Sequence, residues 1–148
     1  MFSKVRMLVA GAAIATALTL TACGGAGTGG GGGGVVLDTG DGLQYVQTAL
    51  TLPATGGTVT FNNKSAGLQH NFVLANGGDD VAAQVNAAGQ ANATTYVAAG
   101  DPNVVVNSAL LNSGANEAVT VPALAAGTYT YLCTYPGHYD AGMKGVLT

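Results

Sequence analysis

Charged side chains are scarce in this chain, and their scarcity argues against nucleic-acid binding. Only 7% of the 148 residues are charged, and four lysines and arginines stand against seven acidic residues. A protein that binds nucleic acid neutralises the phosphates with clustered lysine and arginine, and no such cluster is present. Beyond the first 22 residues only Lys64 and Lys144 remain as cations, so the formal net charge of that part is −5 (2 − 7).

Residues that bind metals or carry redox chemistry are also few. The chain has two histidines, two cysteines and three methionines, with no Cys-x-x-Cys pair. Cys133, His138 and Met143 follow one another with the spacing Cys-x4-His-x4-Met, and the second histidine, His70, lies 63 residues before the cysteine. One thiolate, two imidazoles and a weak axial thioether are the ligands of a blue-copper electron-transfer centre.

The residues between these side chains favour one shared metal ion. Cys133 ends an apparent strand, and a Pro-Gly turn brings His138 back towards it. A further glycine bends the chain before Met143, while His70 comes from a distant strand. Thiolate and imidazole suit both Cu(I) and Cu(II), so such a cage can pass an electron with little rearrangement. The pattern therefore predicts one copper ion that cycles between Cu(I) and Cu(II).

Each of these residues alone has a simpler explanation, and other functions stay open. A lone cysteine is most often a small buried hydrophobe, and a lone methionine fills a core. Structural zinc prefers four cysteines or histidines and does not use methionine. The alternatives are an enzyme with a second, catalytic copper, a copper-delivery protein, and a nucleophile at Cys133 with His138 as its base. The first would need more histidines, and the second more exposed methionines, than the chain contains.

The N-terminus is predicted to be a targeting segment. Two cations precede an apolar run over 7–20, which is typical of a signal peptide and short for a membrane-spanning helix. The sequence Leu-Thr-Ala-Cys over 20–23 resembles the bacterial lipobox, so we expect removal of residues 1–22 and lipidation of Cys23. The alternatives are an ordinary cleaved signal and a disulfide between Cys23 and Cys133, which would consume the thiol that the metal needs.

A glycine-rich stretch separates this signal from the rest of the chain. Residues 24–34 are almost all glycine, a composition that cannot bury apolar surface and behaves as a flexible coil. We therefore predict that residues 23–41 are the lipidated cysteine and a tether, and that residues 42–148 form one copper-binding domain.

Short β-branched and aromatic segments dominate the rest of the chain and predict an all-β fold. Turn residues separate the expected strands, which are 43–47, 57–61, 70–74, 104–106, 118–121, 128–133 and 145–148. Strands at this spacing favour a two-sheet Greek-key β-sandwich. One short helix is expected over 79–88, capped by Asp79 or Asp80. Residues 87–100 are rich in alanine and asparagine and are expected to form an irregular flap.

The metal-binding stretch carries a family resemblance. The sequence Cys-Thr-Tyr-Pro-Gly-His over 133–138, followed by Met-Lys-Gly over 143–145, resembles the copper loop of azurin-type cupredoxins. His70-Asn71 resembles their first histidine and the asparagine that follows it. The interval from His138 to Met143 equals that of plastocyanin, and this loop, together with the lipobox and the tether, is most similar to the auracyanin-type cupredoxins.

The resemblance implies the cupredoxin fold and a set of site residues. His70, Cys133, His138 and Met143 are by this resemblance the copper ligands. Asn71 and Thr134 are implied to brace the ligand loops and to tune the potential from outside the ligand set. The carbonyl of Gln69 stands where azurins have a distant fifth donor.

The resemblance also implies a role without catalysis. We expect a monomeric electron carrier, not an enzyme, that is exported and held by its lipid on the periplasmic or outer face of the cell membrane. Its expected donor is a quinol-oxidising membrane complex, and its expected acceptor is a cytochrome c or a photosynthetic reaction centre. Such a carrier would serve a photosynthetic or respiratory chain.

Overall fold

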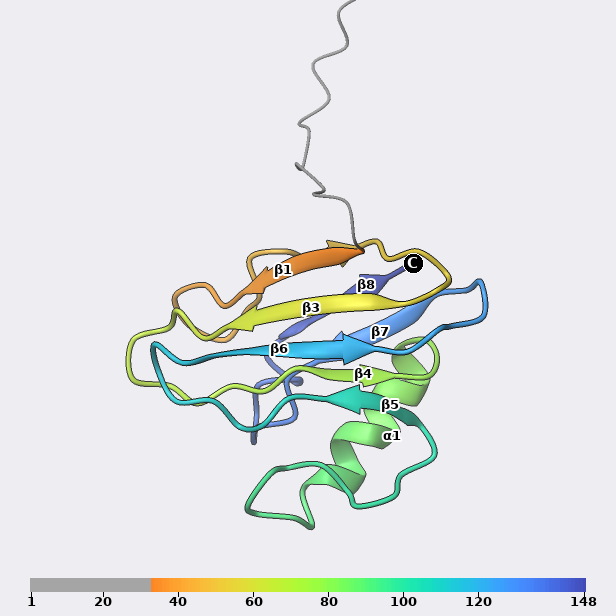
Figure 1. Ribbon diagram of the computed structural model, residues 1–148. Helices are drawn as coiled ribbons and strands as arrows, with labels where there is room; N and C mark the ends of the chain where they lie inside the picture. The colour runs from red at the N-terminus through yellow and green to blue at the C-terminus, as the bar shows by residue number, and fades with distance from the viewer. Residues whose placement is uncertain (1–32) are drawn as a thin grey trace, which may run out of the picture.

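The computed structural model describes residues 33–148, which form a β-sandwich with one helix (Figure 1). The predicted signal peptide, Cys23 and most of the predicted tether lie outside these residues. Within the described part, no helix has both the length and the hydropathy that crossing a membrane requires.

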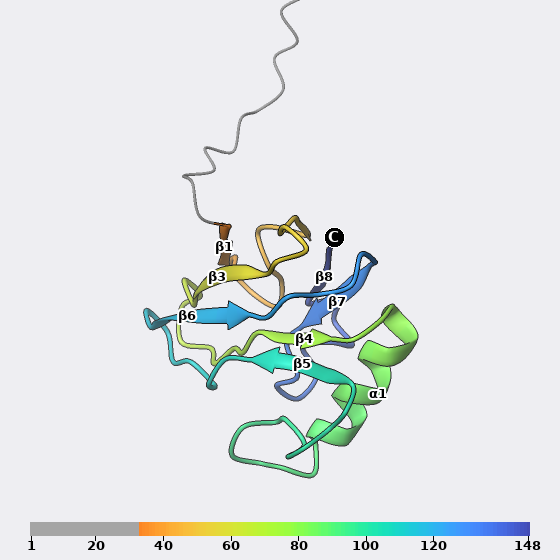
Figure 2. The ribbon, with the colours of Figure 1, turned by 45° about the vertical axis from the view of Figure 1, so that its right-hand side comes forward.

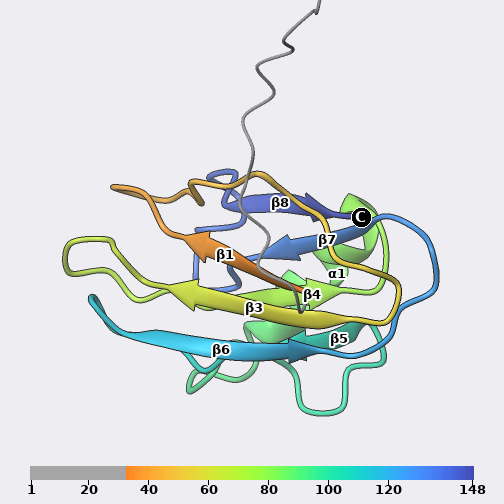
Figure 3. The same ribbon diagram turned by 45° about the horizontal axis from the view of Figure 1, so that its top comes forward.

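Two sheets make up the sandwich. The smaller has the strand order β1-β3-β6 and the larger β2-β8-β7-β4-β5. β1 runs parallel to β3 and β2 runs parallel to β8, whereas the other neighbours are antiparallel. Figure 3 shows the smaller sheet in front of the larger one. The strands are β1 Gly34–Asp38, β2 Ala49–Leu50, β3 Gly57–Asn62, β4 Val73–Ala75, β5 Val104–Asn107, β6 Asn116–Val121, β7 Tyr129–Leu132 and β8 Lys144–Leu147.

The core lies between the sheets because alternate side chains of each strand point inwards. In β3 the side chains of Val59 and Phe61 are fully buried, whereas Thr58 and Thr60, which alternate with them, are half-buried. All four residues of β7 are buried, because α1 (Asp79–Gly89) covers the outer face of the larger sheet (Figure 2). A second apolar cluster joins the two, in which Ala82 and Val85 of α1 pack against Val73 and Leu132 of the strands.

The predicted fold class is confirmed, as are most of the expected strands and the helix. The helix begins at Asp79, but its N-cap is Gly78, with no side-chain hydrogen bond, so the predicted aspartate cap is wrong. Both aspartates lie in the first turn instead, where their charge favours the positive end of the helix dipole. The flap expected over 87–100 is irregular only from Gln90, because α1 continues to Gly89, and residues 90–103 contain turns and no further helix or strand.

The predicted boundary between tether and domain needs correction. Residues 34–38, assigned to the tether, form β1, which pairs with β3 from Gly34 opposite Thr58 to Asp38 opposite Asn62. Leu37 is fully buried in the core. The glycine content of 24–34 hid this strand, because only the short apolar run at 35–37 signals it. The strand expected over 43–47 is also wrong, since that segment contributes a single bridge between Thr39 and Tyr45.

The copper loop and the point where the chain enters the domain lie at opposite ends of the sandwich. At one end the described chain begins beside Pro53, and the last residue, Thr148, accepts a hydrogen bond from the backbone of Leu52. Tyr129 and Leu147, which pair with each other, lie at the same end. Cys133 follows β7 at the other end, so the predicted copper loop lies far from the point where the chain enters the domain.

Candidate metal centre

Three of the predicted ligands converge on one buried point. The Nδ1 atom of His138 lies 3.4 Å from the Sγ of Cys133 and 3.1 Å from the Nδ1 of His70, and the Sγ lies 3.8 Å from the Nδ1 of His70. His70 and Cys133 are fully buried, and His138 is 4% exposed. Among the described residues, these three form the one cluster of histidine, cysteine and acidic side chains close enough to share a metal ion.

These distances suit a single copper ion. Imidazole nitrogen and thiolate sulfur bond a zinc ion at about 2.0 and 2.3 Å, and donors that share one ion of similar size lie within twice such lengths of one another, as the observed separations of 3.1–3.8 Å do. Two nitrogens and one sulfur form the trigonal donor set of blue copper. The Nδ1 of His70 faces the Cys133 thiol and the Nδ1 of His138, whereas its Nε2 is buried without a hydrogen-bond partner in the described part of the chain, so Nδ1 is the atom that this imidazole offers to a metal.

The backbone of the copper loop places the remaining ligand. Met143 accepts a backbone hydrogen bond from the N–H of Cys133 (3.1 Å) and donates one to the carbonyl of His138 (3.0 Å). Its side chain is fully buried in the same core cluster as Cys133. Gly137 and Gly142 make this path possible, because both have positive φ, 80° and 97°, which other residues rarely adopt. The loop therefore returns to its own starting point.

His70 enters from the other side of the site. It precedes β4 and forms an isolated bridge with Leu111, through backbone hydrogen bonds of 3.1 and 2.8 Å. Regular pairing of this strand begins only at Val73, three residues later than His70. The expected strand over 70–74 is therefore shorter than predicted, but it does deliver the imidazole to the centre.

Asn71 and Thr134 join the two ligand segments. The Thr134 N–H donates to the side-chain oxygen of Asn71 (2.9 Å), and the Asn71 amide donates to the Thr134 hydroxyl (2.8 Å). These residues directly follow His70 and Cys133, so the paired bonds fix the separation of the two ligands. The two residues thus connect the ligand segments, and their effect on the potential stays a prediction.

Several supporting residues were not anticipated. Tyr45 donates its hydroxyl to the Asn71 carbonyl (2.7 Å). The amide of Asn63, a buried residue, donates to the carbonyls of Leu68 and Leu111 on either side of His70 (2.8 and 2.9 Å). Each contact spans a loop or separate strands, so no local pattern announces it. The side chain of Gln69 donates to Asn112 (2.8 Å), and an approach of its carbonyl to the metal stays a prediction.

Burial keeps the free donors uncharged. Burial, and then the neighbouring His138, lower the pKa of His70 to about 4, and burial also lowers the pKa of His138. Burial raises the pKa of the Cys133 thiol to about 11, although backbone N–H groups of Asn71 and Tyr135 act in the opposite direction. The imidazoles are therefore ready to bind a cation at neutral pH, and copper binding must displace the thiol proton.

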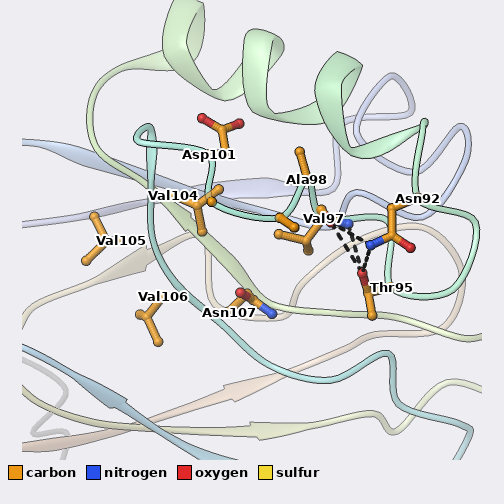
Figure 4. A pocket seen from close by; sticks show the side chains of 11 residues that line it. Asn92, Thr95, Val97, Ala98, Asp101, Val104, Val105, Val106 and Asn107 are labelled. Atoms are coloured by element: carbon orange, nitrogen blue, oxygen red, sulfur yellow. Dashed lines mark hydrogen bonds between the residues drawn. The ribbon is translucent and has the colours of Figure 1, made fainter.

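A separate cavity of about 370 Å³ lies between the flap and β5 (Figure 4). Its lining includes Asn92, Thr95, Val97 and the strand residues 104–107. None of the four predicted ligands lines it, so it is distinct from the metal centre.

Comparison with known proteins agrees with this geometry. Residues 34–148 match the family described as copper binding proteins, plastocyanin/azurin family. Auracyanin-B of Chloroflexus aurantiacus is 52% identical over an alignment of 114 positions, which covers 73% of this chain and 48% of auracyanin-B. The chain thus spans about half the length of that relative. Auracyanin-A of the same organism is 44% identical over an alignment of 112 positions, which covers 73% of this chain and 68% of that relative.

A solved structure is also similar. Sodium-dithionite-reduced auracyanin from the photosynthetic bacterium Roseiflexus castenholzii matches with a TM-score of 0.75 and 39% identity, over 80% of this chain and 98% of that one. The copper cofactor that the sequence predicts is supported by the family match and by the converging donors together. The chain therefore belongs to the plastocyanin/azurin family of copper-binding proteins, the cupredoxins.

Proposed function

We propose that this cupredoxin is a membrane-tethered type 1 copper carrier that passes single electrons between membrane redox complexes. The observation that carries the proposal is the convergence of one sulfur and two nitrogen donors in a buried cage that the fold itself preforms. Bound copper would supply the Cu(II)/Cu(I) couple. The protein would hold the donors in one arrangement for both oxidation states, which keeps the rearrangement that accompanies each transfer small.

The alternatives fit the structure less well. A nucleophilic cysteine needs an accessible thiol with a lowered pKa, whereas Cys133 is fully buried and its pKa is raised to about 11. A copper-delivery protein needs donors that exchange their metal readily, and these donors are buried. An oxidase needs a second metal cluster, and residues 33–148 contain one such cluster only.

Tethering by a lipid on Cys23 is the second part of the proposal. The described chain begins at the end of the sandwich remote from Cys133, beside Pro53. A leash attached there would leave the copper loop free to meet partners while the protein stays at the periplasmic or outer face of the membrane. Since the most similar proteins include auracyanins, one of them from a photosynthetic bacterium, we propose a quinol-oxidising complex as donor. The proposed acceptor is a cytochrome c or a reaction centre.

Substitution of Cys23 separates the two parts of the proposal. Cys23→Ala should release the full-length protein from the membrane fraction, because the acyl attachment is lost, while the visible colour of the copper-loaded protein is retained. If the Cys23→Ala protein is coloured but stays in the membrane fraction, the proposed tether at Cys23 is wrong, whereas the proposed electron-carrier function is unaffected.

The carrier itself is tested on native membranes. The copper-loaded protein should be bleached when quinol is added with the membranes, and its colour should return when oxidised cytochrome c follows. A protein that stays coloured with quinol and membranes, yet is bleached by dithionite, would refute the proposed donor.

A further inference from the structure

One residue of the flap has an unusual backbone. Tyr96 has φ of 55°, and among residues 33–148 it is the one residue other than glycine with positive φ. A bulky side chain in the left-handed region is uncommon, and it persists only where the surroundings impose it. Such residues gather at functional sites, so the contacts of Tyr96 define what it could do.

The turn that imposes this conformation is built around Asn92. The Asn92 side chain donates to the hydroxyl of Thr95 (2.8 Å) and to the carbonyl of Val97 (3.0 Å) (Figure 4). The backbone carbonyl of Asn92 accepts a hydrogen bond from the N–H of Tyr96 (2.8 Å). Val97 is buried against α1. The carbonyl of Tyr96 also lies against Gly89, where any side chain would collide with it. The end of the helix and the turn therefore hold Tyr96 in place together.

The ring of Tyr96 is connected to the metal centre through contacts with one intermediate ring. It meets Tyr135 edge-on, with ring centroids 5.1 Å apart and an interplanar angle of 68°. Tyr135 in turn lies against the imidazole of His138, with centroids 4.8 Å apart at 49°. A ring series thus runs from the flap to a copper ligand, and both tyrosines are half-buried.

Two hydrogen bonds attach the flap region to the ligand segments as well. The Asn71 amide donates to the carbonyl of Thr95 (3.1 Å), directly before Tyr96 in the chain. The Gln90 amide donates to the carbonyl of Thr134 (3.0 Å), directly before Tyr135. The backbones on both sides of the tyrosine pair are therefore fixed relative to each other, so the ring contact has a defined geometry.

We propose that Tyr96 is a positioning residue for the copper site: its ring holds Tyr135 against the imidazole of His138 and excludes water from that side. Tyr96 acts through Tyr135 and not on the metal. The inference rests on the copper site, and it holds whether or not the tether and the partners proposed above are correct. It also gives the strained turn a purpose, because φ of 55° aims the ring at Tyr135.

Loss of the ring has a defined electrochemical consequence. Without it Tyr135 and the imidazole gain freedom, and water comes closer to the site. Water favours the oxidised state, because Cu(II) with one thiolate carries one more positive charge than Cu(I) with the same thiolate. The reduction potential should therefore fall, and electron self-exchange should slow several-fold because more solvent must reorganise.

The test compares three variants of the copper-loaded full chain. Tyr96→Gly removes the ring and keeps the backbone, since glycine adopts positive φ without strain. Tyr96→Phe keeps the ring and should match the wild type in potential, visible spectrum and self-exchange rate. Tyr129→Ala removes a ring at the far end of β7 and should lower thermal stability without moving the potential. Redox titration, the relative intensities of the visible bands and line broadening of the mixed redox states give the readouts.

The expected result is a lowered potential, altered band intensities and slower self-exchange for Tyr96→Gly alone. A variant with lower thermal stability but wild-type potential and spectrum would overturn the proposal, because Tyr96 would then only stabilise the flap. An equal shift in Tyr96→Phe would overturn it too, since the hydroxyl and not the ring would be responsible. If Tyr96→Gly fails to take up copper, Tyr96→Asn carries the test under the same criteria, because asparagine also tolerates positive φ.

Discussion

The two ends of the sandwich differ in the kinds of side chains that are buried there. At the copper end polar residues are buried among the apolar ones and are joined by side-chain hydrogen bonds, as in the Asn71–Thr134 pair and the Asn63 amide. The opposite end is closed by apolar side chains. The buried polar residues other than Thr130 lie towards the copper end, and they are Thr39, Asn63, Ser65, His70, Asn71, Ser108, Thr134 and His138. The residues of the opposite end include Leu50, Leu52, Val121, Tyr129 and Leu147.

Because of this difference, the two ends are expected to contribute differently to the stability of the fold and to the geometry of the metal site. Apolar contacts are non-directional and stabilise roughly in proportion to the area that they bury. Buried polar groups are costly unless they are hydrogen-bonded, but a satisfied network admits only one arrangement. The apolar end is therefore expected to contribute stability, and the polar end to hold the donors in place. Changes at the two ends should consequently produce different kinds of defect.

The largest effect is expected from the thiol. Cys133→Ser should abolish the intense visible colour, because that colour arises from charge transfer between thiolate and Cu(II). The absorption spectrum after copper addition measures the effect, and Tyr129→Phe at the opposite end should stay coloured. Persistent strong colour in Cys133→Ser would mean that the thiolate ligand comes from elsewhere in the chain.

A matched pair of substitutions tests the comparison directly. Leu52→Ala at the apolar end should cost about 2–5 kcal/mol of unfolding free energy, as is usual for a core leucine, with an unchanged reduction potential. Asn71→Ala should leave buried groups of Thr134 without partners, which costs about 1–3 kcal/mol, and should also shift the potential. Urea unfolding and redox titration measure both. Equal potentials in the two variants would show that the Asn71–Thr134 bonds stabilise the fold without shaping the site.

The metal ligands could be predicted from the sequence because cysteine, histidine and methionine are rare in the chain and three of the four ligands are closely spaced. The loop of 133–143 is local, so its turns and spacing could be interpreted without the fold. The fold class followed from strand periodicity. The exact bounds of the strands depend on which strands pair in the folded protein, and the sequence pattern does not show that. β1 was not predicted because three apolar residues beside a glycine run are a weak signal for a strand. Its parallel pairing with β3 stabilises the strand in the folded protein.

The supporting residues of the site could not be found in this way. Asn63 lies 48 residues from its acceptor Leu111, and Tyr45 lies 26 residues from Asn71. Tyr96 sat in a segment without periodicity, and its relation to His138 depends on two ring contacts made across the fold. Long-range contacts of single polar or aromatic residues leave no periodic trace, which is why the resemblance to cupredoxins, and not the pattern, pointed to Asn71.

Acid should affect the metal-free protein at its polar end. The pKa of His70 is about 4 in the fold, against 6.5 for an unperturbed histidine, so below pH 6.5 the unfolded chain binds a proton that the folded chain refuses. Stability is therefore lost as the pH falls from about 6.5 to about 4, by about 3 kcal/mol from His70 alone. The lowered pKa of His138 acts in the same direction.

Urea unfolding of the metal-free and copper-loaded proteins over this pH range measures the effect. His70 and His138 would each hold bound copper through a ring nitrogen that is then closed to protons, so the loaded protein should resist acid until the metal leaves. The carboxylates are common to both forms and provide the internal control. A metal-free protein of constant stability between pH 6.5 and pH 4 would contradict the burial of neutral imidazoles.

The smallest effect is expected from an exposed polar contact beside the copper loop. Asp79 accepts hydrogen bonds from Lys144 (2.6 Å) and Tyr139 (2.7 Å), which lower its pKa, but its side chain is 61% exposed. Asp79→Asn should therefore cost less than about 1 kcal/mol, and the difference from wild type should shrink at high salt. The matched control is Asp38→Asn, which breaks the other ion pair, with Lys64. If the potential moves in Asp79→Asn but not in the control, solvent-exposed contacts would also hold the copper loop, and geometry would no longer depend on the buried network alone.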